Sequence, residues 1–230
     1  MHLILMRVCR VLVFGLAIVG ASLLNDGAAK AGEVAINGQA GGCFGVACIP
    51  SGTGQSQTAS LLGLTYNGSR FDPTMTNGSA DLNFPAAPPI NDGNLGSFTL
   101  STTPNNYNGN SFNLLLTFSS PKGVPDQIFT ALVTGTVLGN GSGGVFVDFD
   151  NTPRHVTFSY TAGALLINGS FDLTVDDVTV AAGQTAALTG HIRNADQGPA
   201  AVPEPASLFL LGTGLTGVAA AFRRRRRKIK

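Results

Sequence analysis

The sequence contains no tryptophan, and only 3 of its 230 residues are tyrosine. Charged residues make up 12% of the chain, and cysteine occurs three times. No long amphipathic helical pattern occurs between residues 32 and 201, which argues against a helical fold for this region. Its abundant glycine, together with Asn, Ser and Thr, is typical of a turn-rich β protein from a secreted compartment.

Basic side chains are also scarce between residues 32 and 201. This region carries eleven acidic and four basic residues, a net charge of −7. A nucleic-acid-binding surface needs a basic face that neutralises phosphates. We therefore predict that nucleic acid is not a partner.

Residue types that commonly carry catalysis are few. Between residues 32 and 201 the histidines are His155 and His191, and the sequence has no Gly-x-Ser-x-Gly or His-Glu-x-x-His motif. We predict a protein that is not an enzyme. Two alternatives stay open: a secreted carbohydrate-binding module, weakened by the absence of Trp, and a surface glycoside hydrolase, whose carboxylate pair the sequence does not single out.

The first 31 residues have the pattern of a secretory signal peptide. Two arginines precede an apolar run at 11–24, and Ala29 and Ala31 form a small-x-small cleavage site. Cleavage there would place the new N-terminus at Gly32. An uncleaved anchor helix is the alternative.

The C-terminal segment, residues 202–230, combines three features in order. A Pro-Glu-Pro turn precedes the uncharged run 206–222, and a basic tail occupies 223–230. Seventeen residues of helix span roughly 25 Å, the lower limit for crossing a hydrocarbon core. The positive-inside rule holds the basic tail in the cytoplasm and places the body outside it. On this evidence alone, a plain tail anchor is an alternative.

The residues of this segment resemble the PEP-CTERM sorting signal of Gram-negative bacteria. The recognition and processing box would be Val202, Pro203, Glu204 and Pro205, and the terminal cluster would be Arg223, Arg224, Arg225, Arg226 and Arg227. The resemblance implies processing by exosortase, an integral membrane transpeptidase, of a precursor held in the inner membrane by its C-terminal helix. It also implies a cell-surface or extracellular-matrix protein, with exopolysaccharide or biofilm as an expected association.

Cys43 and Cys48 are the cysteines of the region 32–201, and they lie five residues apart in a glycine-rich stretch. An oxidising compartment favours their pairing, so we predict a local disulfide. A redox or metal-binding role is the alternative, although two cysteines without a nearby histidine make a poor zinc site.

From residue 60 onward, apolar and polar residues alternate with the period of a half-buried strand. The clearest segments are 112–118, 154–160 and 170–175. Further strands are predicted at 61–66, 95–100, 128–138, 145–149, 165–167, 178–181 and 185–192. Residues 196–201 are expected to form a short linker.

Asn-Gly pairs at 67–68, 77–78, 108–109, 140–141 and 168–169 predict turns between these strands. Many short strands without crossover helices favour an all-β fold, an antiparallel β-sandwich of two sheets over residues 32–201. A jelly roll or a closed barrel is the alternative. A signal helix and a transmembrane helix are expected to flank it.

Asp148 and Asp150 are predicted on one face of a strand end, and Asp176 and Asp177 supply two more carboxylates. Clusters of carboxylate oxygens bind Ca²⁺ outside the cell, where even weak sites fill. Calcium at Asp148 and Asp150 is therefore a hypothesis, with solvated carboxylates as the alternative. No other cofactor is expected.

Overall fold

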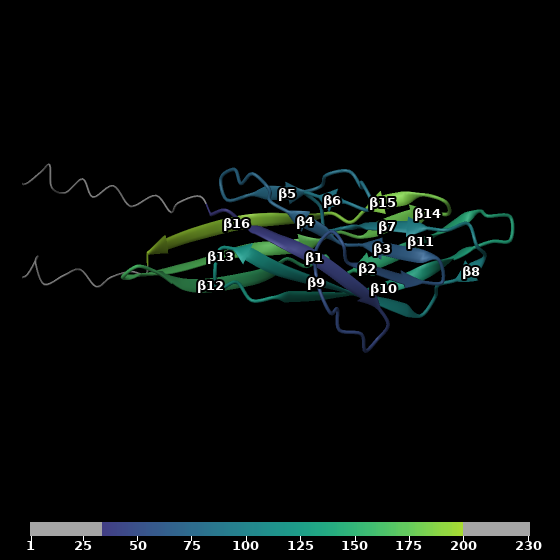
Figure 1. Cartoon of the computed structure of the whole chain (residues 1–230), viewed down its shortest axis with the longest axis horizontal. Helices are drawn as coiled ribbons and strands as arrows, with labels where there is room; N and C mark the ends of the chain where they lie inside the picture. Colours follow the sequence, from purple (N-terminus) through teal and green to yellow (C-terminus); the bar gives the residue numbers. More distant parts are fainter. Residues whose placement is uncertain (1–33, 200–230) are drawn as a thin grey trace, which may run out of the picture.

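The computed structural model describes residues 34–199 and confirms an all-β fold for them. The body is elongated, and its strands run roughly along the long axis (Figure 1). Within residues 34–199, no helix has the length and apolar character needed to span a bilayer. The predicted signal helix and the predicted transmembrane helix at 206–222 lie outside the described residues.

Hydrogen bonding divides the strands among three sheets, where the sequence predicts two. The largest has the order β14 (Val178–Ala181), β11 (Gly143–Phe149), β10 (Gln127–Val137), β9 (Asn110–Ser120), β1 (Asn37–Phe44), β4 (Ser69–Phe71) and β6 (Asn91–Asp92), with β8 (Asn105–Asn106) also paired to β10. The second has the order β12 (Arg154–Ala162), β13 (Leu165–Val175), β16 (Gly190–Pro199) and β5 (Ala80–Leu82). The third has the order β15 (Thr185–Ala187), β7 (Ser97–Leu100), β3 (Leu64–Asn67) and β2 (Thr58–Leu61). The described pairs are antiparallel except β4 with β6, which is parallel.

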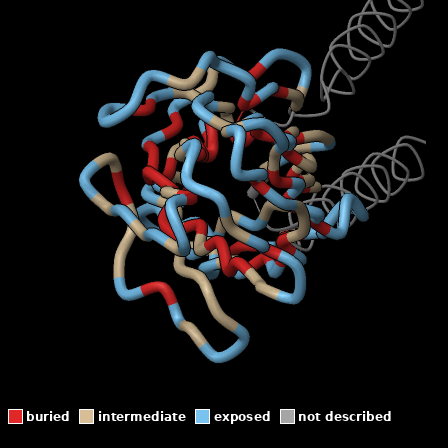
Figure 2. Tube along the Cα trace, turned by 90° about the vertical axis from the view of Figure 1, so that its right-hand side faces the viewer, coloured by how far each residue is buried: buried red, intermediate tan, exposed pale blue. Residues whose placement is uncertain are grey.

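One apolar core joins the three sheets, and buried segments line the interior along the trace (Figure 2). Tyr66 and Phe98 of the third sheet pack on Phe112 of the largest sheet, with ring centroids 4.9 and 5.0 Å away. Phe118 of the largest sheet packs on Phe171 of the second, 5.6 Å away. Aromatic contacts therefore hold the second and third sheets against the largest one.

The period-two pattern is confirmed where the sequence shows it most clearly. Phe112 and Leu114 of β9 are fully buried, and Val156 and Phe158 of β12 are buried as well. His155 and Thr157, on either side of Val156, are exposed. The alternation thus predicts which face of each strand contacts the core.

The prediction of one strand over 61–66 is wrong, because the chain turns back inside it. β2 and β3 form a hairpin with Leu62 and Gly63 at its tip, both with positive φ, 51° and 88°. A tight hairpin of this kind normally uses Asn-Gly or a similar pair, since β-carbons disfavour positive φ. Leu62 carries no such signal in the sequence.

Two of the predicted Asn-Gly turns are also wrong. One pair that the structure confirms is Asn77–Gly78, which forms a tight turn with φ of 50° and 71°. The 67–68 pair instead connects β3 to β4, which belong to different sheets, and the 168–169 pair lies inside β13. The chemistry of Asn-Gly permits a turn but does not require one.

The expected linker at 196–201 is strand up to Pro199. β16 pairs with β13 as far as Ile167 opposite Pro199, after a register shift near Ser170. The β-structure therefore continues almost to the C-terminal segment.

Candidate functional site

The predicted processing and topology residues lie outside the described residues. They are Val202, Pro203, Glu204, Pro205, Ala29, Ala31, Arg223, Arg224, Arg225, Arg226 and Arg227. The structure does describe the two points at which the body connects to these segments.

Both ends of the described chain lie at one end of the body (Figure 1). β16 leaves the second sheet at Pro199, next to Ile167. Val34 lines the same hollow as Thr161 of β12 and Gln197 of β16. The N-terminal and C-terminal segments therefore start from the same end of the body, beside the β12–β13 hairpin.

Cys43 and Cys48 form a disulfide, as the sequence predicts, with their Cα atoms 6.1 Å apart. The loop between them is fixed to β9 on both sides. The Gly45 N–H donates to the Ser111 carbonyl at 2.9 Å, and the Asn113 amide donates to the Cys48 carbonyl at 2.8 Å. The pair closes a small ring next to β9.

Asp148 and Asp150 are exposed at the end of β11. Hydrogen bonds from Thr152 lower the pKa of Asp150, and its carboxylate accepts the Thr152 N–H at 3.0 Å. The nearby Asp177 carboxylate accepts the Phe149 N–H at 2.8 Å. Residues 34–199 bring no three His, Cys, Asp or Glu side chains together as metal ligands. Calcium at this pair stays a prediction.

A charged network lies on the outer face of the second sheet, opposite the core. His191 of β16 places Nδ1 2.9 Å from the Asp81 carboxylate and Nε2 3.3 Å from the Asp176 carboxylate. The Arg193 guanidinium also bonds Asp81, and the Thr189 hydroxyl donates to Asp176 at 2.6 Å. The imidazole is thereby held between two carboxylates.

These contacts lower the pKa of Asp81. The hydrogen bond with His191 is the largest cause and that with Arg193 the second, since both favour the ionised carboxylate. His191 lies near the end of the predicted strand 185–192, and the sequence does not connect it to Asp81. The two residues are 110 positions apart and meet because β5 pairs with β16. No local pattern signals that pairing.

A second polar cluster lies on the same face, one strand further along. The Asn194 amide donates to Asp172 at 2.7 Å, and His155 Nδ1 lies 2.8 Å from the same carboxylate. These bonds lower the pKa of Asp172, with Asn194 as the larger cause. Each histidine of the body is therefore paired with an aspartate from a neighbouring strand.

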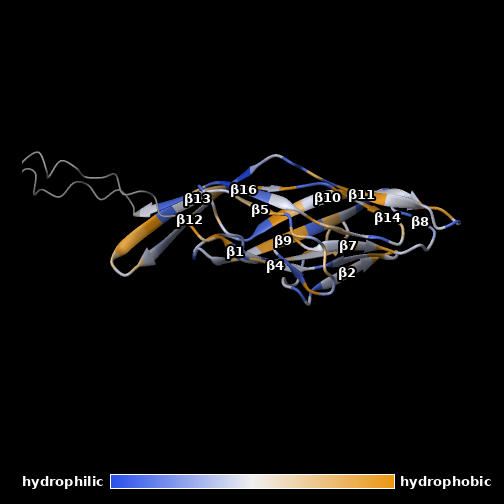
Figure 3. Cartoon of the chain, turned by 90° about the horizontal axis from the view of Figure 1, so that it is seen from above, coloured by the Kyte–Doolittle hydropathy of each residue, from blue (hydrophilic) through white to orange (hydrophobic). Residues whose placement is uncertain are grey.

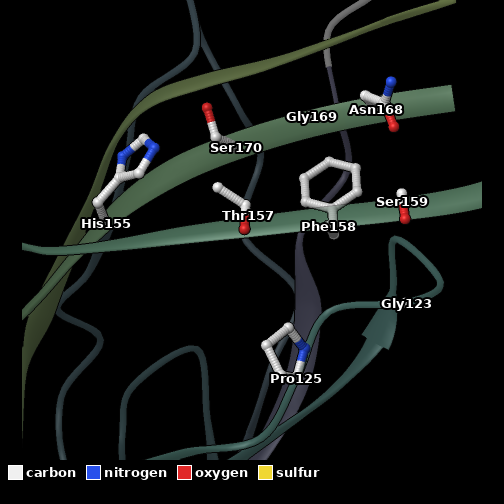
Figure 4. A pocket seen from close by; sticks show the side chains of 9 residues that line it. All are labelled: Gly123, Pro125, His155, Thr157, Phe158, Ser159, Asn168, Gly169 and Ser170. Carbon is white, nitrogen blue, oxygen red and sulfur yellow. The ribbon is translucent and has the colours of Figure 1, made fainter. Parts of the chain in front are cut away.

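An open groove runs along β12 and β13 beside this cluster (Figure 4). Four of the nine lining residues carry a hydroxyl or an amide, the ring of Phe158 lies between the strands, and the 123–125 loop runs along the edge. The lining residues are Gly123, Pro125, His155, Thr157, Phe158, Ser159, Asn168, Gly169 and Ser170. Such a surface offers hydrogen bonds to a neutral polar ligand.

Neither histidine of the described residues is paired with a nucleophile. Nucleophilic catalysis needs a hydroxyl or thiol hydrogen-bonded to a base. Among residues 34–199, His155 and His191 bond to carboxylates, and His191 also to Arg193, but neither bonds to a hydroxyl. Both imidazoles are held by carboxylates on the outer face of the second sheet.

A family model described as the PEP-CTERM protein-sorting motif matches residues 201–227. The match confirms the resemblance inferred from the C-terminal residues. It identifies an exported protein, made as a membrane-anchored precursor, that exosortase processes on its way to the cell surface. No curated protein and no solved structure matches the chain.

Proposed function

We propose that this chain is a non-enzymatic cell-surface or extracellular-matrix protein whose β-sandwich-like body is released from its membrane anchor at the Pro-Glu-Pro box. The observation that carries the proposal is the position of the sorting motif. The motif starts at residue 201, two residues after β16 ends at Pro199. A folded body is thus joined to its sorting signal with almost no spacer.

The test is to replace Pro203 and Pro205 together by alanine in cells that contain exosortase. The unprocessed precursor should then accumulate in the membrane fraction, and mass spectrometry of its C-terminus should find the basic tail intact. Pro104→Ala, at an exposed loop position of the body, is the matched control and should be processed normally. Normal removal of the tail from the double variant would contradict the proposal.

We base the non-enzymatic role on the histidine contacts of residues 34–199, in which neither imidazole bonds to a hydroxyl or thiol that could act as a nucleophile. His155 and His191 have carboxylate partners at 2.8 and 2.9 Å, on a face that also carries neutral hydroxyls. We propose that this face is a binding surface and not a catalytic one. A His155→Gln variant that still binds exopolysaccharide would agree with this role, because the imidazole ring would then serve only to position neighbouring side chains.

The proposed partner is exopolysaccharide, bound in the groove of β12 and β13. The hydroxyl and amide groups of Thr157, Ser159, Asn168 and Ser170 suit sugar hydroxyls, and the groove is open enough for a chain to lie along it. In a pull-down with exopolysaccharide from the producing cells, Ser159→Val should reduce retention several-fold. Thr179→Val, on an exposed position of β14 in another sheet, is the control and should retain binding. Equal retention of the two variants would contradict the groove as the site.

A further inference from the structure

The β12–β13 hairpin projects beyond the core at the end of the body where the chain leaves. In β13 the alternation of buried and exposed positions begins only near Phe171, while Leu165 and Leu166 are 53% and 49% exposed. A strand that covered a core at this point would bury one of two successive residues. Both leucines are exposed, so the tip stands clear of the core on both faces.

The hairpin tip, defined as residues 161–167, is apolar and uncharged. Its sequence is Thr-Ala-Gly-Ala-Leu-Leu-Ile, and the stretch from Thr157 to Phe171 contains no acidic or basic side chain. In Figure 3 the end of the β12–β13 hairpin is coloured as hydrophobic. Exposed leucines at the end of a hairpin leave apolar area in water, which is unfavourable unless a partner covers it.

The tip lies on the side toward which the C-terminal segment leaves. β13 runs antiparallel to β16, and Ile167 is opposite Pro199. Leu165 is therefore two positions further outward than the end of β16, about 7 Å at the rise of a strand. Six residues lie between Pro199 and Ala206, where the uncharged run starts, and the seven Cα–Cα steps span at most roughly 25 Å. The hairpin tip can therefore reach the surface of any membrane that the uncharged run 206–222 enters.

We propose that the hairpin tip rests in the interface of the membrane that anchors the precursor, with Leu165 and Leu166 in contact with lipid. This inference rests on the proposed function, which holds the precursor in the membrane by its C-terminal segment. Lys122 is exposed and lines the hollow next to Thr161, where it suits anionic headgroups. Contact at the tip would fix the orientation of the body and keep the residues after Pro199 close to the bilayer surface, where a membrane enzyme acts.

The chain supplies a matched control at its other end. Leu138 follows β10 in the β10–β11 hairpin and is 53% exposed, as Leu165 is. This hairpin lies near β8, at the end of the body opposite the β12–β13 hairpin (Figure 1). The two sites share residue type, exposure and hairpin context but differ in distance from the anchored end.

The experiment uses the full chain in vesicles of phosphatidylethanolamine and phosphatidylglycerol, with Cys9→Ser so that the third cysteine of the sequence does not take up the label. An environment-sensitive fluorophore is attached through Leu166→Cys or through Leu138→Cys, and nitroxide-labelled lipid is the quencher. We expect the lipid to quench the Leu166→Cys probe several-fold more strongly than the Leu138→Cys probe. Adding Leu165→Ser should weaken that quenching without lowering the melting temperature.

Three outcomes would overturn the inference. Equal quenching at the two positions in a chain that stays with the vesicles overturns the lipid contact alone. A probe at 166 that is protected from water but not quenched by lipid means that a second copy or the chain's own C-terminal segment covers the tip. A chain that washes off the vesicles in alkaline carbonate overturns the membrane anchor of the proposed function, and the tip contact with it.

Discussion

Phe158 of β12 lies against Gly169, its cross-strand partner on β13. A Cβ atom at position 169 would come within 2.2 Å of the ring's Cζ atom and within 2.5 Å of the Asp196 carbonyl oxygen, so the ring and the backbone of β16 occupy the space that a side chain would need. The ring is 5% exposed and faces Phe171 with centroids 6.4 Å apart. Glycine inside this strand therefore lets an aromatic side chain cover its backbone.

Gly169→Ala should lower the free energy of unfolding by about 1–3 kcal/mol, because the added methyl group collides with the Phe158 ring and with the Asp196 carbonyl oxygen. Urea unfolding of the purified protein measures this change. Gly198→Ala is the control, since a Cβ there has no atom within 4 Å and the residue is in the same sheet. A destabilisation of equal size in both variants would mean that replacing any glycine in this sheet lowers the free energy of unfolding, whether or not the new methyl group meets neighbouring atoms.

The contact between Phe158 and Gly169 also helps to explain which parts of the fold the sequence predicts. Alternation in β9, β12 and β13 identified the buried faces correctly because burial on one face of a strand imposes period two directly. Asn168-Gly169 has the local chemistry of a turn, but the Phe158 ring requires the glycine within a strand. Leu62 shows the reverse case, a turn residue without a turn signal. At Leu62 and at Gly169, tertiary contacts and not the local sequence determine the backbone conformation.

The candidate site was less predictable than the fold. The pairing of Cys43 with Cys48 follows from their proximity in the sequence and an oxidising compartment. The contact between Asp81 and His191 depends on strand order, because β5 and β16 are distant in the chain and adjacent in the second sheet. Strand order is set by the packing of the whole core, so no local segment encodes it.

Tyr66→Phe should destabilise the protein although it keeps the ring. Tyr66 is fully buried, and its hydroxyl donates to the Leu95 carbonyl at 2.7 Å. Without that donor the carbonyl stays buried and unsatisfied, at a cost of about 1–3 kcal/mol in the free energy of unfolding. Tyr160→Phe, at a partly exposed position whose hydroxyl bond is 3.4 Å, is the control and should change stability less. Equal losses would show that the buried hydrogen bond is not the cause.

The Cys43→Ser/Cys48→Ser double variant should lose about 2 kcal/mol of unfolding free energy, because a closed loop of this length reduces the entropy of the unfolded chain. Denaturant titration with and without dithiothreitol measures it. The reductant should bring the wild-type midpoint to that of the double variant and leave the double variant unchanged. If the wild-type midpoint does not change when the reductant is added, the disulfide does not stabilise the protein.

Acid should destabilise the body in part through Asp81. Its pKa is lowered in the folded state by His191 and then by Arg193, so the ionised carboxylate is favoured by folding. The stabilisation is present above the carboxyl's ordinary value of 3.8 and is lost as the pH falls through the lower folded-state value. Asp81→Asn removes this titration. Its melting temperature should therefore fall less than that of the wild type between about pH 4 and pH 2.

The control for this titration is Asp126→Asn. Asp126 is exposed and takes part in none of the ion pairs of residues 34–199, so the variant should retain the acid dependence of the wild type. At neutral pH, Asp81→Asn should itself be less stable than the wild type, because the guanidinium of Arg193 loses its charged partner. If both variants follow the wild-type curve down to about pH 2, the acid sensitivity comes from other carboxylates, and Asp172, whose pKa is also lowered, is the next residue to replace.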